Sequence, residues 1–148
     1  MGQKKWLIFV LIFVFSLMCY HFWTAVNFDN IKYIKIAGQD IKVELALTED
    51  ARERGLSGRQ NLNENEGMLF VFDHPGQYYF WMKDMNFPID IIWISEDRKV
   101  IYIKKDAQPE LYPETYGPEP DAKYVLEIAS GFSEKNNLKE GDRVSFTY

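Results

Sequence analysis

The domain is organised around residues 80–94, which read FWMKDMNFPIDIIWI. This is the most apolar stretch outside the N-terminal segment, yet it contains Lys83, Asp84 and Asp90. Charged side chains rarely enter apolar runs unless they are paired or face a cleft. The stretch therefore predicts a buried core that also carries a polar site.

Residues 80–83, FWMK, followed by residues 88–91, PIDI, resemble the central motif of the domain-of-unknown-function 192 family, which typically reads FWMKN and then PLDI. Three further stretches match: Arg52 with Gly55, Leu56 and Arg59; residues 67–70 with Phe72; and residues 124–127 with Gly131. The similarity covers roughly Val43 to Val144. It implies a compact, mostly β domain of a kind often found in exported or membrane-anchored proteins, and it implies no particular activity.

The chain departs from the family pattern at two positions. Asp84 stands where Asn is usual, and Ser57 stands where Met is usual. Any fixed role that the Asn amide has in the family therefore does not carry over unchanged to Asp84.

Length and composition predict one domain. The 148 residues divide into an N-terminal segment, residues 1–26, and a domain, residues 27–148, that is long enough to bury a core. Apolar residues make up 47% of the chain and aromatic residues 16%, which argues against disorder. The formal net charge is −5, and without Lys4 and Lys5 the domain holds 15 basic against 22 acidic residues, a net charge of −7. This acidic balance argues against nucleic acid as the partner.

The residues that usually bind metals are scarce. Cys19 is the one cysteine, so the chain forms no internal disulfide and no cysteine-based zinc cluster. The two histidines, His21 and His74, are too few and too far apart for a typical histidine metal site. We therefore predict no metal and no cofactor, and packing alone must hold the domain together.

The N-terminal segment has the pattern of a membrane anchor. Trp6 to Val26 is a run of 21 residues with no formal charge, and it follows Lys4 and Lys5. A helix of this length spans about 30 Å, enough for the hydrocarbon core of a bilayer. We therefore expect a single-pass protein of the cell membrane with a cytoplasmic N-terminus and an extracytoplasmic domain. The alternative is a cleaved signal peptide, although no small-x-small cleavage site follows the run.

The rest of the chain has the pattern of short strands joined by turns. We expect a hairpin of residues 34–36 and 41–45, a short helix between Thr48 and Gly55, a meander of strands at 68–72, 78–83, 89–94 and 100–104, a proline-rich flap at 106–121, and strands at 122–128 and 143–146. Local pairing of this kind closes into a small antiparallel barrel or sandwich. The predicted fold class is mainly β (α+β), with one or two short helices, preceded by one N-terminal transmembrane helix.

The candidate ligand-binding residues combine charged groups with one aromatic side chain. They are Arg52, Arg59, Trp81, Lys83, Asp84, Asp90 and Glu127. If strands 78–83 and 89–94 pair, Lys83 and Asp90 lie close together, with Trp81 as the floor of a concave site. The structural alternative is that the two arginines pair with carboxylates and fix the helix and the following loop onto the sheet.

Three functions are compatible with these residues. The first is a binding or accessory module for a small polar or carbohydrate-like ligand, or for a protein segment of an envelope partner. The second is a hydrolase that acts through the carboxylates of Asp84 and Asp90, and the third is a purely structural partner domain. The sequence contains no Ser-His pattern, no glycine-rich phosphate loop and no metal signature. The binding module is therefore our first hypothesis.

Overall fold

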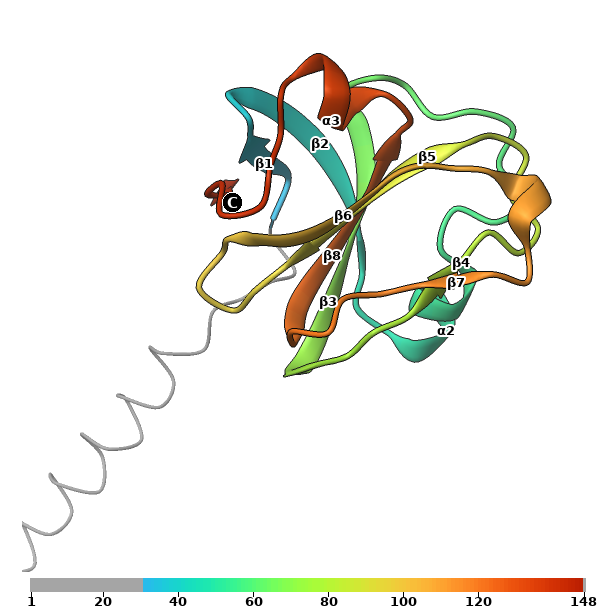
Figure 1. The fold of residues 1–148 in the computed structure, drawn as a ribbon, viewed down its shortest axis with the longest axis horizontal. Helices are drawn as coiled ribbons and strands as arrows, with labels where there is room; N and C mark the ends of the chain where they lie inside the picture. The colour runs from blue at the N-terminus through green and yellow to red at the C-terminus, as the bar shows by residue number, and fades with distance from the viewer. Residues whose placement is uncertain (1–30, 148) are drawn as a thin grey trace, which may run out of the picture.

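The computed structural model describes residues 31–147, which fold around one strongly curled sheet (Figure 1). Seven strands form this sheet in the order β6-β5-β8-β3-β2-β1-β9, and β4 pairs with β7 in a separate two-stranded ribbon. The elements are β1 (Tyr33–Ile36), β2 (Gln39–Ala46), α2 (Glu49–Arg54), β3 (Glu66–Gly76), β4 (Phe80–Trp81), β5 (Ile89–Ile94), β6 (Val100–Ala107), the 3-10 helix η2 (Pro109–Leu111), β7 (Thr115–Tyr116), β8 (Ala122–Ala129), α3 (Phe132–Lys135) and β9 (Ser145–Thr147). The prediction of a mainly β domain with two short helices is thus confirmed.

Turn chemistry explains the first hairpin. β1 and β2 pair antiparallel, with Ile36 opposite Gln39 across a two-residue turn. The two turn residues, Ala37 and Gly38, have positive φ angles of 49° and 78°. Positive φ at both positions is the geometry of a type I′ turn, whose twist matches that of the paired strands, and the predicted hairpin forms around it.

Capping residues explain the bounds of α2. The helix begins after Thr48, whose Oγ1 accepts a hydrogen bond from the Ala51 N–H at 3.2 Å. This contact satisfies one of the N–H groups that the first turn of a helix leaves unpaired. The helix ends at Gly55, which has a φ of 52° and so takes up a conformation that favours glycine. The predicted short helix is confirmed at both ends.

The strand order differs from the predicted antiparallel meander in two ways. β8 lies between β3 and β5 and pairs antiparallel with both, although the proline-rich segment separates it from β6 along the chain. β2 and β3 run parallel, with Val43 opposite Gly67, because the chain crosses over through α2 before it enters β3. Alternation in the sequence shows which face a side chain occupies, whereas it does not specify which strands become neighbours.

The predicted strand at residues 78–83 is much shorter than expected. Only Phe80–Trp81 is extended, as β4, and it pairs with Thr115–Tyr116 of β7 rather than with β5. Lys83 lies in an exposed turn just after this short strand. The pairing that would place Lys83 beside Asp90 therefore does not form, and that expectation is wrong.

The proline-rich segment packs against the rest of the domain, as the prediction of a flap requires. It contains η2, a cis peptide bond before Pro113, and β7. Tyr116 of β7 is buried, and Lys104 Nζ lies 4.4 Å from the centroid of its ring. We call β4, β7 and residues 108–114 together the side lobe. The side lobe lies at one end of the molecule, beside α2 and away from β1 (Figure 1).

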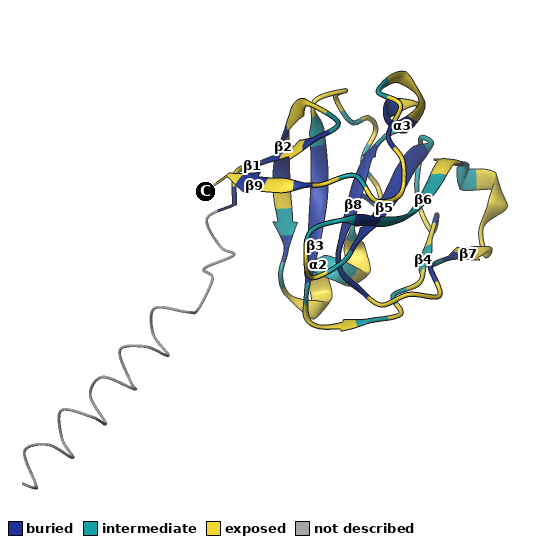
Figure 2. Cartoon of the chain, turned by 60° about the vertical axis from the view of Figure 1, so that its left-hand side comes forward, coloured by how far each residue is buried: buried dark blue, intermediate teal, exposed yellow. Residues whose placement is uncertain are grey.

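Two hydrophobic clusters cover the two faces of the sheet, and the strands between them are buried along most of their length (Figure 2). In β5 every residue is buried. Ile92 and Ile94 belong to one cluster, while Ile91 and Trp93 belong to the other. A strand that is covered on both faces has a continuous apolar sequence, which explains why this strand shows little polar alternation.

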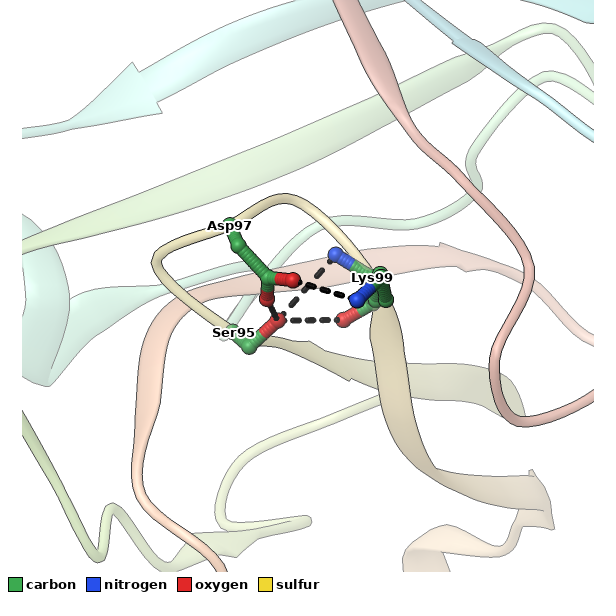
Figure 3. A network of polar contacts seen from close by, with 3 residues as sticks. All are labelled: Ser95, Asp97 and Lys99. Atoms are coloured by element: carbon green, nitrogen blue, oxygen red, sulfur yellow. Dashed lines mark hydrogen bonds and ion pairs between the residues drawn. The ribbon is translucent and has the colours of Figure 1, made fainter.

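Polar side chains close the hairpin between β5 and β6 (Figure 3). Ser95 Oγ donates to Asp97 Oδ1 at 2.5 Å and accepts from the Lys99 N–H at 3.1 Å. Lys99 Nζ forms an ion pair with Asp97 Oδ2 at 2.6 Å. Arg98, between them, has a positive φ of 61°. These contacts fix the turn and so the register of the two strands.

Asp90 is the one charged residue of β5, and its exposed fraction is 0%. Its Oδ1 accepts from the backbone N–H groups of Asp106 and Gly131 at 2.9 and 3.3 Å, and its Oδ2 accepts from that of Ser133 at 2.7 Å. These bonds tie the end of β6 and the start of α3 to β5. Asp90 is therefore a structural residue of the core in this fold.

Replacing Asp90 is expected to destabilise the domain strongly. Asp90→Ala leaves three N–H groups without their acceptor, and we expect the free energy of unfolding to fall by about 3 kcal/mol or more. Asp142→Ala is the control, because Asp142 Oδ2 accepts one exposed bond, from the Lys139 N–H at 3.0 Å. Urea unfolding of both variants measures the difference. If Asp90→Ala and Asp142→Ala both lowered the free energy of unfolding by the same small amount, Asp90 would not be a structural residue of the core.

The predicted membrane anchor, Trp6 to Val26, lies outside the described residues. Within residues 31–147 no helix is both long enough and apolar enough to cross a membrane. The anchor therefore stays a prediction from the sequence.

Candidate functional site

A pocket of about 270 Å³ opens between α2 and the side lobe. α2 and the residues that follow it, up to Ser57, form one wall, and residues 77–81 form the other. Five aromatic residues line it: Phe72, Tyr78, Tyr79, Phe80 and Trp81. The charged residues that line it are Arg52, Glu53, Arg54 and Glu127. A cavity that combines aromatic side chains with a few polar groups is the usual form of a small-molecule site.

Glu127 is the polar group of the pocket that is most fully removed from water. It lies in the middle of β8, opposite Met68 of β3 and Ile91 of β5, with an exposed fraction of 4%. The Leu56 N–H donates to its carboxyl group, whereas Oε2 has no hydrogen-bond partner. Burial raises the pKa of Glu127 to about 8, although the Leu56 N–H and the charge of Arg59 oppose this rise. At neutral pH the group is therefore an uncharged carboxylic acid, which can donate a hydrogen bond.

Gly55 provides the space above this carboxyl group. A Cβ atom at Gly55 would lie 3.3 Å from Phe70 Cζ and 3.4 Å from Glu127 Oε2, and the φ of Gly55 is 52°. Any larger residue would therefore adopt a strained backbone and press on the carboxyl group. The glycine of the matching Gly55-Leu56 motif thus has a direct role in forming the pocket.

Arg52 joins α2 to the sheet. Its Nη1 donates to the carbonyl oxygens of Leu47 at 2.6 Å and Val71 at 3.0 Å. Its guanidinium carbon lies 5.4 Å from the ring centroid of Phe72, in cation–π contact. Arg52 therefore holds the helix that forms one wall, as the structural alternative predicted, although its partners are carbonyl groups rather than a carboxylate.

Arg59 pairs with Glu44 of β2 through two parallel bonds of 2.7 and 2.6 Å. The bidentate geometry is that predicted for an arginine that fixes the loop onto the sheet. The pair lowers the pKa of Glu44 and raises that of Arg59, chiefly through these hydrogen bonds. Both side chains are partly exposed, so the pair contributes modestly to stability. Arg59 does not line the pocket, and it acts on Glu127 through its charge alone.

Trp81 lines the pocket at its mouth rather than at its floor. Its exposed fraction is 46%, and the buried carboxyl group of Glu127 takes the place that was predicted for the tryptophan. Lys83 Nζ lies 5.8 Å from the Trp81 ring centroid. Tyr112 of the proline-rich segment makes an edge contact with Trp81 at 6.0 Å between centroids. The flap therefore reaches the edge of the site.

Asp84 has a backbone role. It is exposed and has a positive φ of 55°. Its carbonyl oxygen accepts from the Gly58 N–H at 2.8 Å, and Ser57 Oγ donates to the carbonyl of Lys83 at 2.8 Å. Asn adopts positive φ readily, and Asp does so as well. An Asn at this position would thus have the same backbone role, and Ser57 gains a hydrogen bond that Met cannot make.

The structure brings together three of the seven predicted site residues, Arg52, Trp81 and Glu127. Lys83 and Asp84 lie in a shallow neighbouring depression beside α2. Asp90 is fully buried in contact with backbone groups, and Arg59 pairs with Glu44. The expected cluster of Lys83 with Asp90 is absent.

Several lining residues were missed from the sequence. Tyr78, Tyr79 and Phe72 stand outside or at the edge of the motifs, and nothing in their spacing indicated a shared pocket. Phe72 and Tyr78 are stacked, with ring centroids 3.4 Å apart and an angle of 9°. Gly55 carried a physical signal, because a glycine that ends a helix often has a positive φ.

Comparison with known proteins agrees with this architecture. Residues 32–146 match DUF192, a family described as "Uncharacterized ACR". The chain belongs to this family. The membrane-anchored or exported character that the resemblance implied is not part of what the match shows.

Relatives and solved structures are similar to this chain over more than two thirds of its length. UPF0127 proteins of Thermococcus kodakarensis and Thermococcus gammatolerans are each 30% identical to the chain, over 112 and 110 residues, or 72% and 70% of it. The match spans 65% of the length of each relative, which is less than two thirds. A Novosphingobium aromaticivorans protein of unknown function has a crystal structure with a TM-score of 0.74 at 31% identity, covering 78% of this chain and 84% of that one. A Sinorhizobium meliloti structure, described as a proposed transcription regulator, has a TM-score of 0.72 at 29% identity, covering 77% and 90%.

Protonation of Glu127 is expected to make the stability of the domain fall as pH rises. The unfolded chain releases this proton near pH 4.5, whereas the folded domain keeps it up to about pH 8. The stability contribution is thus fully present below pH 4.5 and is lost as the pH rises to 8. Across that window, wild type loses about 1.4 kcal/mol per pH unit relative to Glu127→Gln.

Urea unfolding of wild type and Glu127→Gln at several pH values within this window checks the prediction. The difference between the two free energies of unfolding should change steadily with pH, because the Gln side chain does not titrate there. If the free energies of unfolding of wild type and Glu127→Gln changed with pH in parallel, the Glu127 carboxyl group would be ionised in the folded domain.

Proposed function

We propose that this DUF192 domain is a binding module for a small, uncharged polar ligand that occupies the pocket between α2 and the side lobe. The observation that carries the proposal is Glu127, which lines the pocket and whose carboxyl oxygen Oε2 is buried without a hydrogen-bond partner. An unpaired polar atom in such a place costs free energy, so a natural structure retains it for a reason. A ligand hydroxyl or carbonyl group supplies the missing partner.

The charge state of the site favours a neutral ligand. Because the pKa of Glu127 is raised to about 8, the group is a hydrogen-bond donor at neutral pH and offers no negative charge to a cation. Arg52 lines the pocket, and its Nη1 donates to two carbonyl groups while its guanidinium lies over the ring of Phe72. Glu53 and Arg54 carry opposite charges and both line the pocket. With Glu127 uncharged, the charges that line the pocket sum to +1, and the remaining charge is that of Arg52, which is held against the sheet.

Three alternatives have weaker support. A hydrolase that uses Asp84 and Asp90 requires both carboxylates to reach a substrate, yet Asp90 has no exposed surface and accepts three backbone bonds. A role in nucleic-acid binding, suggested by the description of the Sinorhizobium meliloti structure, conflicts with 15 basic against 22 acidic residues after Lys5. A purely structural partner domain gives no reason for an unpaired buried oxygen.

Binding of matched probes tests the proposal. Each probe has one ring and is neutral, cationic or anionic: glucose, glucosamine and glucuronate, or benzamide, benzylamine and benzoate. We expect the neutral member of at least one set to shift the NMR signals of Leu56, Phe72 and Trp81 most strongly. Glu127→Gln keeps a neutral donor and should retain binding, while Glu127→Leu should weaken it by about tenfold, the cost of one lost buried hydrogen bond.

The pH dependence of probe affinity distinguishes binding of a neutral ligand from binding of a charged one. The affinity of wild type for the neutral probe should fall above about pH 8, where Glu127 loses its proton, and that of Glu127→Gln should stay constant. Tightest binding of a charged probe, or an affinity that rises with pH, would overturn the proposal. So would the absence of binding by all six probes.

We also propose that the domain is tethered to the outer face of the cell membrane. The support is the uncharged run from Trp6 to Val26 after Lys4 and Lys5. In intact cells, added protease should digest the domain, while a cytoplasmic marker protein stays intact. A domain that is protected until the cells are lysed would place it on the cytoplasmic side and contradict the proposed orientation.

A further inference from the structure

We infer that the pocket is one end of a longer site, and that a neutral oligosaccharide extends from it across the exposed aromatic residues of the side lobe. This inference rests on the proposed function, because it assigns the first ring of the chain to the Glu127 pocket. It adds the substrate class and a second subsite, formed by Trp81 and Tyr112.

Exposed aromatic surface is concentrated next to the pocket. Among residues 31–147, five large apolar side chains are exposed, and four of them lie in the side lobe or immediately before β4. These four are Tyr79, Trp81, Leu111 and Tyr112, with exposed fractions of 61%, 46%, 44% and 45%. The fifth, Tyr33, lies on β1 at the other end of the domain. Clustering of this kind marks an interaction site, whereas apolar residues that are exposed singly carry no such meaning.

The cluster is continuous with the pocket. Trp81 and Tyr79 line the pocket and are also exposed to solvent. Each can therefore contact both the part of a ligand inside the pocket and the part that extends out of it. The pocket volume of about 270 Å³ is close to the lower limit for small-molecule sites, so it holds about one ring. A longer ligand must leave through the mouth, where Trp81 stands.

Contacts hold Trp81 and Tyr112 in place before any ligand arrives. Trp81 belongs to β4, which pairs with β7, and its ring is in contact with Lys83 Nζ at 5.8 Å and with the Tyr112 ring at 6.0 Å. Trp81 pairs with Thr115 and lies close to the loop that carries Tyr112. Preorganised aromatic side chains lose little conformational entropy on binding. The subsite formed by Trp81 and Tyr112 is therefore preorganised before a ligand binds.

The chemistry of a neutral sugar chain fits both parts of the site. Each sugar ring has an apolar face of C–H groups, which packs on the electron-rich face of an aromatic ring, and hydroxyl groups, which accept a hydrogen bond from the Glu127 carboxyl. The net charge of −7 after Lys5 disfavours anionic polymers and anionic lipid surfaces. A neutral chain avoids this repulsion.

Affinity as a function of chain length tests the inference. The full-length chain, in a detergent without a sugar head group, is titrated with glucose oligomers of increasing length, in α1,4- and β1,4-linked series. We expect the second ring to raise affinity about threefold to tenfold in at least one series, the gain from one aromatic contact. Tyr112→Ala should remove this gain and lower the affinity for single-ring probes by much less, because Tyr112 touches Trp81 but does not line the pocket.

Tyr33→Ala is the matched control, since Tyr33 is equally exposed, at 43%, but lies on β1. Tyr33→Ala should leave the affinities for single-ring and longer probes unchanged, whereas Trp81→Ala should weaken the binding of both.

If neutral single-ring probes bind but a longer glucose oligomer binds no more tightly, this inference is wrong and the proposed function stands. If no single-ring probe binds, the proposed function itself fails. Concentration-dependent dimerisation that Tyr112→Ala abolishes would assign the aromatic cluster to a second copy of the chain and overturn the inference.

Discussion

A carboxylic acid held out of water in the middle of the sheet is the constraint on which this site depends. Glu127 lies on β8, between β3 and β5, with its carboxyl group beneath Gly55. Because burial penalises the charged form more than the Leu56 N–H and Arg59 favour it, the group stays protonated. Two features around it favour that state: Gly55 leaves space for the carboxyl group, and apolar walls exclude water, whereas the Leu56 N–H opposes it.

The other charged groups that enter this apolar domain are satisfied in different ways. Asp90 accepts three backbone N–H bonds. Arg52 donates to two carbonyl groups. Arg59 forms a bidentate pair with Glu44. Glu127 differs from all of these, because one of its oxygens has no protein partner. This difference separates a structural polar group from a candidate for ligand binding.

The side lobe forms the second wall of the pocket beside Glu127 and so creates an opening to solvent. The ribbon of β4 and β7 lies outside the main sheet and faces α2 across the pocket. Its aromatic residues are held by backbone pairing and by contacts with Lys83 and Tyr112. Burial at the base and exposure at the mouth therefore result from two separate pieces of chain, which only the tertiary fold brings together.

Local signals in the sequence determined the elements with short-range causes. The turn at Gly38, the Thr48 cap and the Gly55 helix end all follow from residue types within a few positions. Only the tertiary structure decided that β8 lies between β3 and β5, that β2 and β3 are parallel, and that Asp90 and Lys83 lie apart. Strand pairing depends on contacts between residues far apart in the chain, and side-chain alternation carries no information on partners. For the same reason, the sequence identified Glu127 and Trp81 as candidates, while the fold decided which of them is the base of the pocket and which is its mouth.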